Sequence, residues 1–192
     1  GERARAEMER AFALDTGDVR VFLELDQLYR KLGMSFADRL ARYEAHPELI
    51  EGRDDLYVEY ITLLDMTGQY ERAYQCMMNH IFHPWEGGEG KITTQYVLSL
   101  LQQAKAALKS KDAVRAEELL RRALHYPENL GEGRLEGTKD NHIYYHLGLA
   151  LEMRAEAAKA QGNVQEGERL VREAAECYER AAVGTDEPAG AM

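Results

Sequence analysis

Apolar residues recur every three or four positions along most of the chain, which is the spacing that one face of an amphipathic helix requires. Residues 19–32 show this most clearly, because Phe22, Leu25, Tyr29 and Leu32 follow it. The same spacing predicts helices over 2–14, 19–32, 36–45, 54–67, 70–82, 92–109, 113–125, 141–160 and 164–183. No segment sustains an alternation of apolar and polar residues, so we expect an all-α protein without a sheet.

Short breaks group these helices into pairs. Gly33, Gly68 and Gly162 each end a helical pattern, and the polar run 110–112 divides another. The sequence therefore predicts one repeat domain over 1–183, with a leading helix at 2–14 and helix pairs at 18–46, 54–82, 92–125 and 141–183. Residues 184–192 are expected to form a disordered tail. Since no helix of this kind buries its apolar face alone, stacked neighbours must supply the core, as in an α-solenoid.

One connecting segment is repeated. Residues 83–91 read HPWEGGEGK, and residues 126–134, which begin 43 positions later, read YPENLGEGR. A shorter copy at 46–53 reads HPELIEGR. Each copy joins His or an aromatic residue and Pro to a Glu-Gly pair and a final cation, and each lies between two predicted helices.

Two interpretations of the repeated segment stay open. In the first it is architecture: glycine permits positive φ, glutamate favours a helix N-terminus, and the tryptophan fills a gap between stacked pairs. In the second it is a recognition surface, because loops on rigid scaffolds often bind partners. The three copies would then align their Glu-Gly-cation motifs, Glu51 and Arg53 included, along one ridge. The candidate residues of this loop ridge are Trp85, Glu86, Glu89, Lys91, Tyr126, Glu132, Arg134 and Arg53. An exposed tryptophan with flanking charges suits a protein hot spot or a sugar-stacking platform.

The second helix pair places Tyr57, Tyr60 and Leu64 before Gly68, and the fourth contains the dipeptide Leu147-Gly148. In these positions the chain, over roughly 18–183, resembles the tetratricopeptide repeat, whose units are helix pairs of about 34 residues. Some positions depart from the family pattern: Ile61 and Asp38 stand where small residues are typical, the third pair lacks the turn glycine, and the fourth pair has longer helices. The loops, chiefly 83–91, also resemble those in the repeat region of large bacterial multidomain proteins that carry an N-terminal domain of unknown function.

The tetratricopeptide resemblance implies a superhelix that binds peptides in a concave groove lined by the first helix of each pair. Mapped onto this sequence, the candidate groove residues are Arg20, Gln27, Asp55, His142 and Tyr145. Family members that clamp a C-terminal carboxylate share Lys, Asn and Arg at such positions. That set is absent here, so the resemblance gives no support to a chaperone tail as ligand.

Composition narrows the class of partner. The net charge is −10, and the basic residues are scattered, which disfavours nucleic acid and anionic membranes. No apolar run reaches the roughly 20 residues needed to span a bilayer. The chain begins with Gly1 inside a helical pattern, so we expect it to be a piece of a longer protein. Cys76 and Cys177 lie inside helical patterns, which favours free thiols and a reducing, cytoplasmic location.

The sequence offers no catalytic or metal-binding motif. His142 and His146 lie four residues apart, but zinc requires at least three ligands with suitable spacing, and no such set is present. Motifs for nucleophilic serine, phosphate binding and dinucleotide binding are also absent. We therefore expect no cofactor, no metal and no enzyme activity. We expect the chain to act as a non-catalytic scaffold that binds a protein or peptide. The partner can also be another domain of the same parent chain. The alternatives are an accessory domain of a carbohydrate-active enzyme, and self-association through end-to-end stacking.

Overall fold

The computed structural model describes residues 1–134 and 140–183. The chain divides into two compact units, Gly1–Cys76 and Met77–Met192, and each is described by itself. The predicted disordered tail, 184–192, lies outside the described residues. Within those residues the structure contains helices and no strand, so the all-α class is confirmed.

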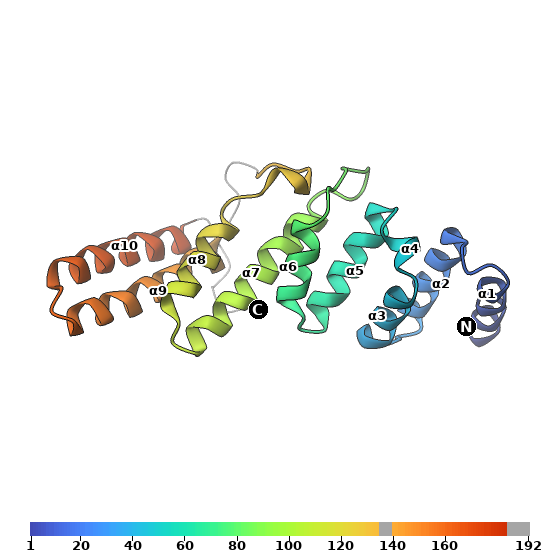
Figure 1. Ribbon diagram of the computed structural model, residues 1–192, viewed down its shortest axis with the longest axis horizontal. Coiled ribbons are helices and arrows are strands. Elements are labelled where there is room, and N and C mark those ends of the chain that lie inside the picture. Colours follow the sequence, from blue (N-terminus) through green and yellow to red (C-terminus); the bar gives the residue numbers. More distant parts are fainter. Residues whose placement is uncertain (135–139, 184–192) are drawn as a thin grey trace. The chain divides into compact units, whose positions relative to one another are not determined.

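The N-terminal unit consists of short helices joined by tight turns (Figure 1). They are α1 (Glu2–Leu14), α2 (Val19–Lys31), α3 (Phe36–Ala45), α4 (Pro47–Ile50), α5 (Asp54–Met66) and most of α6 (Tyr70–Met78). Side-chain caps mark two helix starts: Asp18 accepts hydrogen bonds at the start of α2, and Ser35 accepts one at the start of α3. Helix α3 packs on α5, and the core between the helices is apolar, with Phe22, Ile61 and Leu64 fully buried.

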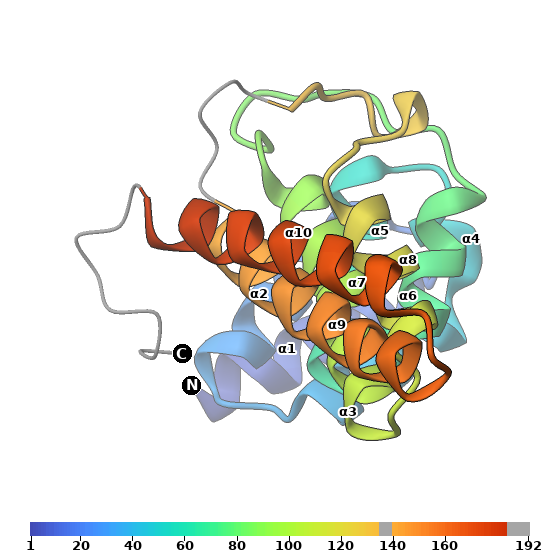
Figure 2. The ribbon, with the colours of Figure 1, turned by 90° about the vertical axis from the view of Figure 1, so that its left-hand side faces the viewer.

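Among its described residues, the C-terminal unit contains three helices of 19 or 20 residues and one of 11, which pack in chain order. They are α7 (Lys91–Lys109), α8 (Ala113–Ala123), α9 (Asn141–Ala160) and α10 (Val164–Ala182), with a short 3₁₀ helix η1 (Glu128–Leu130) before α9. Figures 1 and 2 show α9 and α10 side by side, and Gly148 explains how closely they approach. A Cβ at Gly148 would lie 2.5 Å from the Tyr178 ring, so only glycine lets that ring pack against α9. This all-helical, repeat-like arrangement is the one that the tetratricopeptide resemblance implies.

The turns inside the helix pairs share a left-handed residue. Gly33, Gly68 and Gly162 have φ angles of 77°, 78° and 83°, where a side chain would be strained. The α7–α8 turn lacks a glycine, as the sequence indicated, and Lys111 adopts φ 65° in its place. The α7–α8 turn therefore also has a residue in the left-handed region, although that conformation is unfavourable for lysine.

One helix ends four residues earlier than the sequence prediction, and two short helices were not predicted. Helix α6 ends at Met78 rather than at residue 82, because the Asn129 side chain donates to the carbonyl oxygens of Met77 and His80, both at 2.8 Å. Residues 47–50 and 128–130 form short helices where the prediction has loops. Pro47 starts α4 because proline is well suited to the first position of a helix. Among the described residues, no helix is both long enough and apolar enough to cross a membrane.

Candidate functional site

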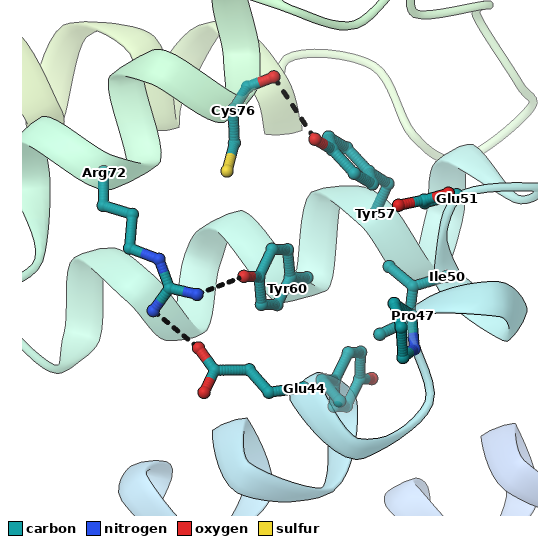
Figure 3. Close-up of a pocket in the computed structure, with 9 residues that line it drawn as sticks. Glu44, Pro47, Ile50, Glu51, Tyr57, Tyr60, Arg72 and Cys76 are labelled. Atoms are coloured by element: carbon teal, nitrogen blue, oxygen red, sulfur yellow. Dashed lines mark hydrogen bonds and ion pairs between the residues drawn. The ribbon is translucent and has the colours of Figure 1, made fainter.

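A pocket of about 290 Å³ opens in the N-terminal unit, where α3, α4, α5 and α6 meet (Figure 3). Its wall combines three tyrosines, an ion pair, a free carboxylate and a thiol. The lining residues are Tyr43, Glu44, Pro47, Ile50, Glu51, Tyr57, Tyr60, Arg72 and Cys76. The volume is at the lower end of the range for small-molecule sites and suits one or two amino-acid side chains.

Tyr57 and Tyr60 form the aromatic wall of the pocket. They lie three residues apart on α5, so both project from one face of the helix. Their ring centroids are 6.1 Å apart and the ring planes are inclined by 57°. Both rings are partly buried, and the Tyr57 hydroxyl donates to the Cys76 carbonyl oxygen at 3.4 Å. Burial raises the pKa of both phenols, so both are neutral at physiological pH.

An ion pair closes one side of the pocket. Arg72 lies 2.6 Å from a Glu44 carboxylate oxygen and donates to the Tyr60 hydroxyl at 2.9 Å. Although burial opposes it, the hydrogen bond to Glu44 raises the pKa of Arg72. This guanidinium is therefore charged, neutralised by its partner and held against the aromatic wall.

Glu51, directly after α4, supplies the free carboxylate. Its side chain is exposed, and within 1–134 and 140–183 it has no hydrogen bond or ion pair. Figure 3 shows Glu51 beside Tyr57 and away from Arg72. The field of Glu51 also contributes to the raised pKa of Tyr57, after burial and the influence of Cys76. The pocket therefore has a neutralised side near Tyr60 and a negative side near Tyr57.

The remaining polar groups of the pocket do not suit catalysis. Burial raises the pKa of the Cys76 thiol, which keeps it protonated, whereas a reactive cysteine needs a depressed pKa. The Tyr43 hydroxyl is fixed by donating to Asp26 at 2.9 Å, below the pocket. The described residues contain no group of three or more side chains that could hold a metal ion.

Three members of the predicted loop ridge take part in local packing. Arg53 forms a two-point ion pair with Asp55, at 2.7 and 3.0 Å, and this pair joins a loop-ridge residue to a predicted groove residue. Glu132 accepts hydrogen bonds from the Gly90 amide at 3.0 and 3.2 Å. Arg134 donates to the Leu124 carbonyl oxygen at 2.6 Å and pairs with Asp140. These contacts favour the architectural interpretation of the repeated segment.

The third copy of the segment is hydrogen-bonded to the second copy, through Glu132 and Gly90, and to Phe82, the residue that precedes the second copy. The Phe82 amide donates to the Asn129 carbonyl oxygen at 2.8 Å, and Figure 2 shows the two loops running together. Trp85 is half-buried and lies over Gly88, where a Cβ would meet its ring at 2.2 Å. Tyr126 packs edge-on against Tyr96, with ring centroids 5.9 Å apart.

Glu86, Glu89 and Lys91 remain exposed on the second copy of the segment. The first copy belongs to the other unit, so the ridge of three aligned loops stays a prediction.

The predicted groove residues are divided between the two units. Arg20 and Gln27 are exposed on α2, and Arg20 pairs with Glu24 on the same helix at 3.4 Å. In the C-terminal unit, His142 is half-buried and Tyr145 is 44% exposed. Tyr145 stacks near Tyr178, with centroids 6.0 Å apart. The groove itself stays a prediction, and none of its residues lines the pocket of the N-terminal unit.

Sequence reasoning missed this pocket for a specific reason. Helical spacing assigns Tyr57 and Tyr60 to an apolar face and so predicts that they are core residues. It does not show that both rings are only partly buried and line a pocket. The available signal was the combination of two tyrosines three residues apart with a preceding Pro-x-x-x-Glu segment, Pro47–Glu51.

No protein-family model matches the chain. Among solved structures, the chain is similar to one described as the crystal structure of MamA. The two are 14% identical over 93% of this chain and 89% of that chain, with a TM-score of 0.45.

Proposed function

We propose that this chain is a non-catalytic interaction module that binds a peptide segment of a protein partner at the pocket of the N-terminal unit. The observation that carries the proposal is the combination of aromatic walls and fixed charges in a cavity of about 290 Å³. Peptide sites of this kind anchor one side chain in a partly apolar pocket and gain specificity from a few polar groups.

The rigidity of the lining supports a binding role. Tyr43, Tyr57 and Tyr60 each have a hydrogen-bonded hydroxyl, so their rings are held in place before a ligand arrives. A preorganised wall loses little side-chain entropy on binding, and more of the contact energy then contributes to affinity. The pocket lies on α3 to α6, and none of the predicted groove residues, which include Asp55 on α5, is among its lining residues.

A peptide-display selection tests the proposal. Short random-sequence peptides would be selected on the wild-type chain and then compared on Tyr60→Ala and Tyr145→Ala. We expect the selected peptides to lose about tenfold or more in affinity on Tyr60→Ala, because the pocket loses one wall, and to bind Tyr145→Ala normally. The Tyr145 variant removes an exposed tyrosine of the predicted groove and is the matched control.

Circular dichroism and thermal unfolding would first establish that both variants are folded, with Tyr57→Leu as a second pocket variant. Peptides that depend on Tyr145 rather than Tyr60 would move the site to the groove. A selection that yields no pocket-dependent peptide would contradict the proposal, and specific binding on a glycan array would favour the carbohydrate-related alternative.

A further inference from the structure

We propose that the pocket selects a basic side chain, so that the bound peptide packs a Lys or Arg against the wall formed by Tyr57 and Tyr60, with its cation at Glu51. This inference rests on the proposed function and names the chemistry of the ligand. It follows from the charges that line the pocket, from its aromatic and apolar wall, and from the hydrogen bonds that its polar groups already form.

The charge balance of the pocket favours a cation. Glu44 and Arg72 form an ion pair and neutralise each other, whereas Glu51 has no partner within 1–134 and 140–183. The pocket therefore carries one unbalanced negative charge. A guest ammonium or guanidinium at Glu51 would complete it with a charge-assisted hydrogen bond.

An anionic guest fits much less well. The cation of the lining, Arg72, already donates to Glu44 and Tyr60. A carboxylate or phosphate at Arg72 would compete with Glu44 for that guanidinium, and one on the opposite side of the pocket would lie beside Glu51. Like charges at such distances are unfavourable, so the existing pair discriminates against acidic peptides.

The wall is also suited to the stem of a long basic side chain. Lys and Arg bury their methylene groups against apolar surface and keep the charged end near water. Pro47 and Ile50 offer that apolar surface, and the rings of Tyr57 and Tyr60 offer faces for a cation–π contact. Glu51 is exposed, so the charged end would reach its partner without full loss of hydration.

The surrounding field has the same sign. Glu48, on the short helix α4 that precedes Glu51, has a side chain that is 61% exposed, and the whole chain carries a net charge of −10. A basic peptide would be attracted over a distance of about a Debye length and would associate faster at low salt.

The test combines the peptide selection with two isosteric variants. Peptides whose binding depends on Tyr60 are expected to share Lys or Arg at one position. For such a peptide, fluorescence anisotropy should show about a tenfold loss of affinity on Glu51→Gln. The control is Glu48→Gln, on the preceding helix α4, which should cause less than about a twofold loss. Replacing the peptide's lysine by norleucine, which keeps the stem and removes the charge, should cause the same loss as Glu51→Gln.

Each result is decisive. The inference is supported if Glu51→Gln and the norleucine peptide each lose affinity, and if the norleucine peptide loses no further affinity on Glu51→Gln. Tyr60-dependent peptides that share an acidic or uncharged side chain instead would overturn this inference and leave the proposed function intact. The absence of any Tyr60-dependent peptide would contradict the proposed function, and the inference with it.

Discussion

The two units both contain a network of arginines and carboxylates, and the networks differ in their exposure to water. In the N-terminal unit, Arg39 donates to both oxygens of Asp26, at 3.0 and 2.8 Å, and to Glu59 at 2.7 Å. The side chains of Arg39 and Asp26 are only 4% and 2% exposed. These contacts join α2, α3 and α5 inside the core.

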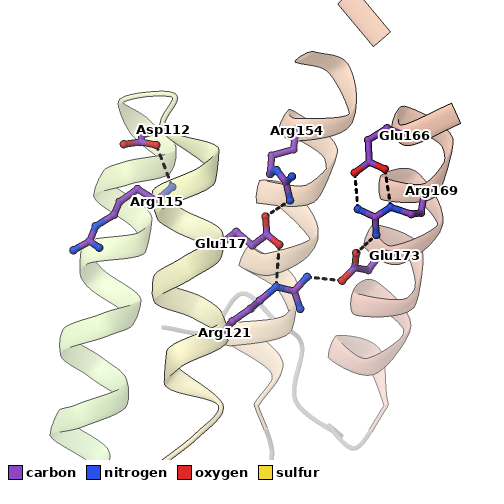
Figure 4. A network of polar contacts seen from close by, with 8 residues as sticks. All are labelled: Asp112, Arg115, Glu117, Arg121, Arg154, Glu166, Arg169 and Glu173. Atoms are coloured by element: carbon purple, nitrogen blue, oxygen red, sulfur yellow. Dashed lines mark hydrogen bonds and ion pairs between the residues drawn. The ribbon is translucent and has the colours of Figure 1, made fainter. Parts of the chain in front are cut away.

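The network of the C-terminal unit lies on the surface (Figure 4). Glu117 on α8 binds Arg121 on its own helix at 2.9 Å and also Arg154 on α9, and Arg121 in turn contacts Glu173 on α10. Their exposed fractions range from 14% for Glu117 to 45% for Arg121. The contacts connect three helices, as in the other unit, but water reaches most of the charges.

The comparison shows that the number of ion pairs is a poor guide to their energetic importance. When a mutation removes one partner of an exposed ion pair, water hydrates the remaining charge and the free energy of unfolding falls only slightly. In a core, removal of one partner leaves the other charge without solvent or counter-charge, which is strongly destabilising. The buried network therefore fixes the positions of its helices, whereas the surface network adjusts to them.

The largest effect is expected for Arg39→Met, which keeps the length of the stem and removes the charge. Asp26 would then lose its two-point partner and keep only the Tyr43 hydroxyl and the more distant Arg42, at 3.9 Å, so we expect the free energy of unfolding to fall by about 3–5 kcal/mol. Urea denaturation followed by circular dichroism measures it. The control is Arg30→Met, because Arg30 is 58% exposed and 3.8 Å from the same Glu59, and it should lose less than about 1 kcal/mol. Equal losses for the two variants would contradict the comparison.

Asp65 sharpens the comparison because it is buried and has no partner in the part of the chain that the structure describes. It is 2% exposed, neither carboxylate oxygen has a hydrogen bond, and burial raises its pKa to about 8. The unfolded pKa is about 3.9, so the folded state binds the extra proton between these values. Protonation of Asp65 therefore contributes to the free energy of unfolding in full below about pH 4, and this contribution is lost as the pH rises towards 8.

We therefore expect Asp65→Asn to be less stable than the wild type near pH 4, where Asp65 is neutral, and to be more stable at pH 8. The expected gain is about 2 kcal/mol, because the unpartnered amide itself costs about 1–3 kcal/mol and offsets part of the benefit. Urea denaturation of both proteins from pH 4 to pH 8 provides the measurement. Parallel pH profiles for the two would show that Asp65 does not titrate in this window.

A smaller effect is expected for Glu132→Ala. Glu132 accepts hydrogen bonds from the Gly90 amide at the start of α7, and it comes from the third copy of the repeated segment. Loss of such a cap typically costs about 1 kcal/mol. Glu128→Ala, at an exposed position in η1, is the control and should have no measurable effect. If Glu132→Ala is equally silent, the hydrogen bonds between the two loops do not contribute to stability.

The smallest effect is expected for Arg121→Ala in the surface network. Its side chain is 45% exposed, so we expect a loss of about 0.2–1 kcal/mol, and less at salt concentrations of about 1 M, where charges are screened. Thermal unfolding at low and high salt measures both quantities. A loss as large as that of Arg39→Met, or one that is unchanged by salt, would mean that the surface network is more rigid than its exposure indicates.

Local patterns were sufficient to predict most of the fold. Gly33, Gly68 and Gly162 mark the turns in the sequence because a left-handed residue is a local requirement, and helical periodicity locates the helices on either side. The end of α6 at Met78 could not be predicted, because Asn129 supplies the hydrogen bonds that end it from 51 residues further along the chain. Such a partner leaves no signal near residue 78.

The candidate site was harder to predict. Glu51 and Arg53 were identified through the repeated segment, yet Arg53 pairs with Asp55 and only Glu51 lines the pocket. Arg72 and Glu44 lie on different helices, and their pairing depends on how α3 and α6 are placed. Composition and spacing contain no information about that distance. The network around Asp26 was missed for the same reason, since its members come from three helices.

The junction between the loops has a consequence for synthesis of the chain. Ribosomes add roughly 5–20 residues per second, so Asn129 follows the end of α6 by several seconds. During that interval the Phe82 amide and the carbonyl oxygens of Met77 and His80 lack their final partner. Phe82, which is 3% exposed in the complete fold, leaves the ribosome before that partner has been made. A nascent chain paused within this interval would present an apolar side chain to chaperones, and the second copy of the segment would close only after the third had been translated.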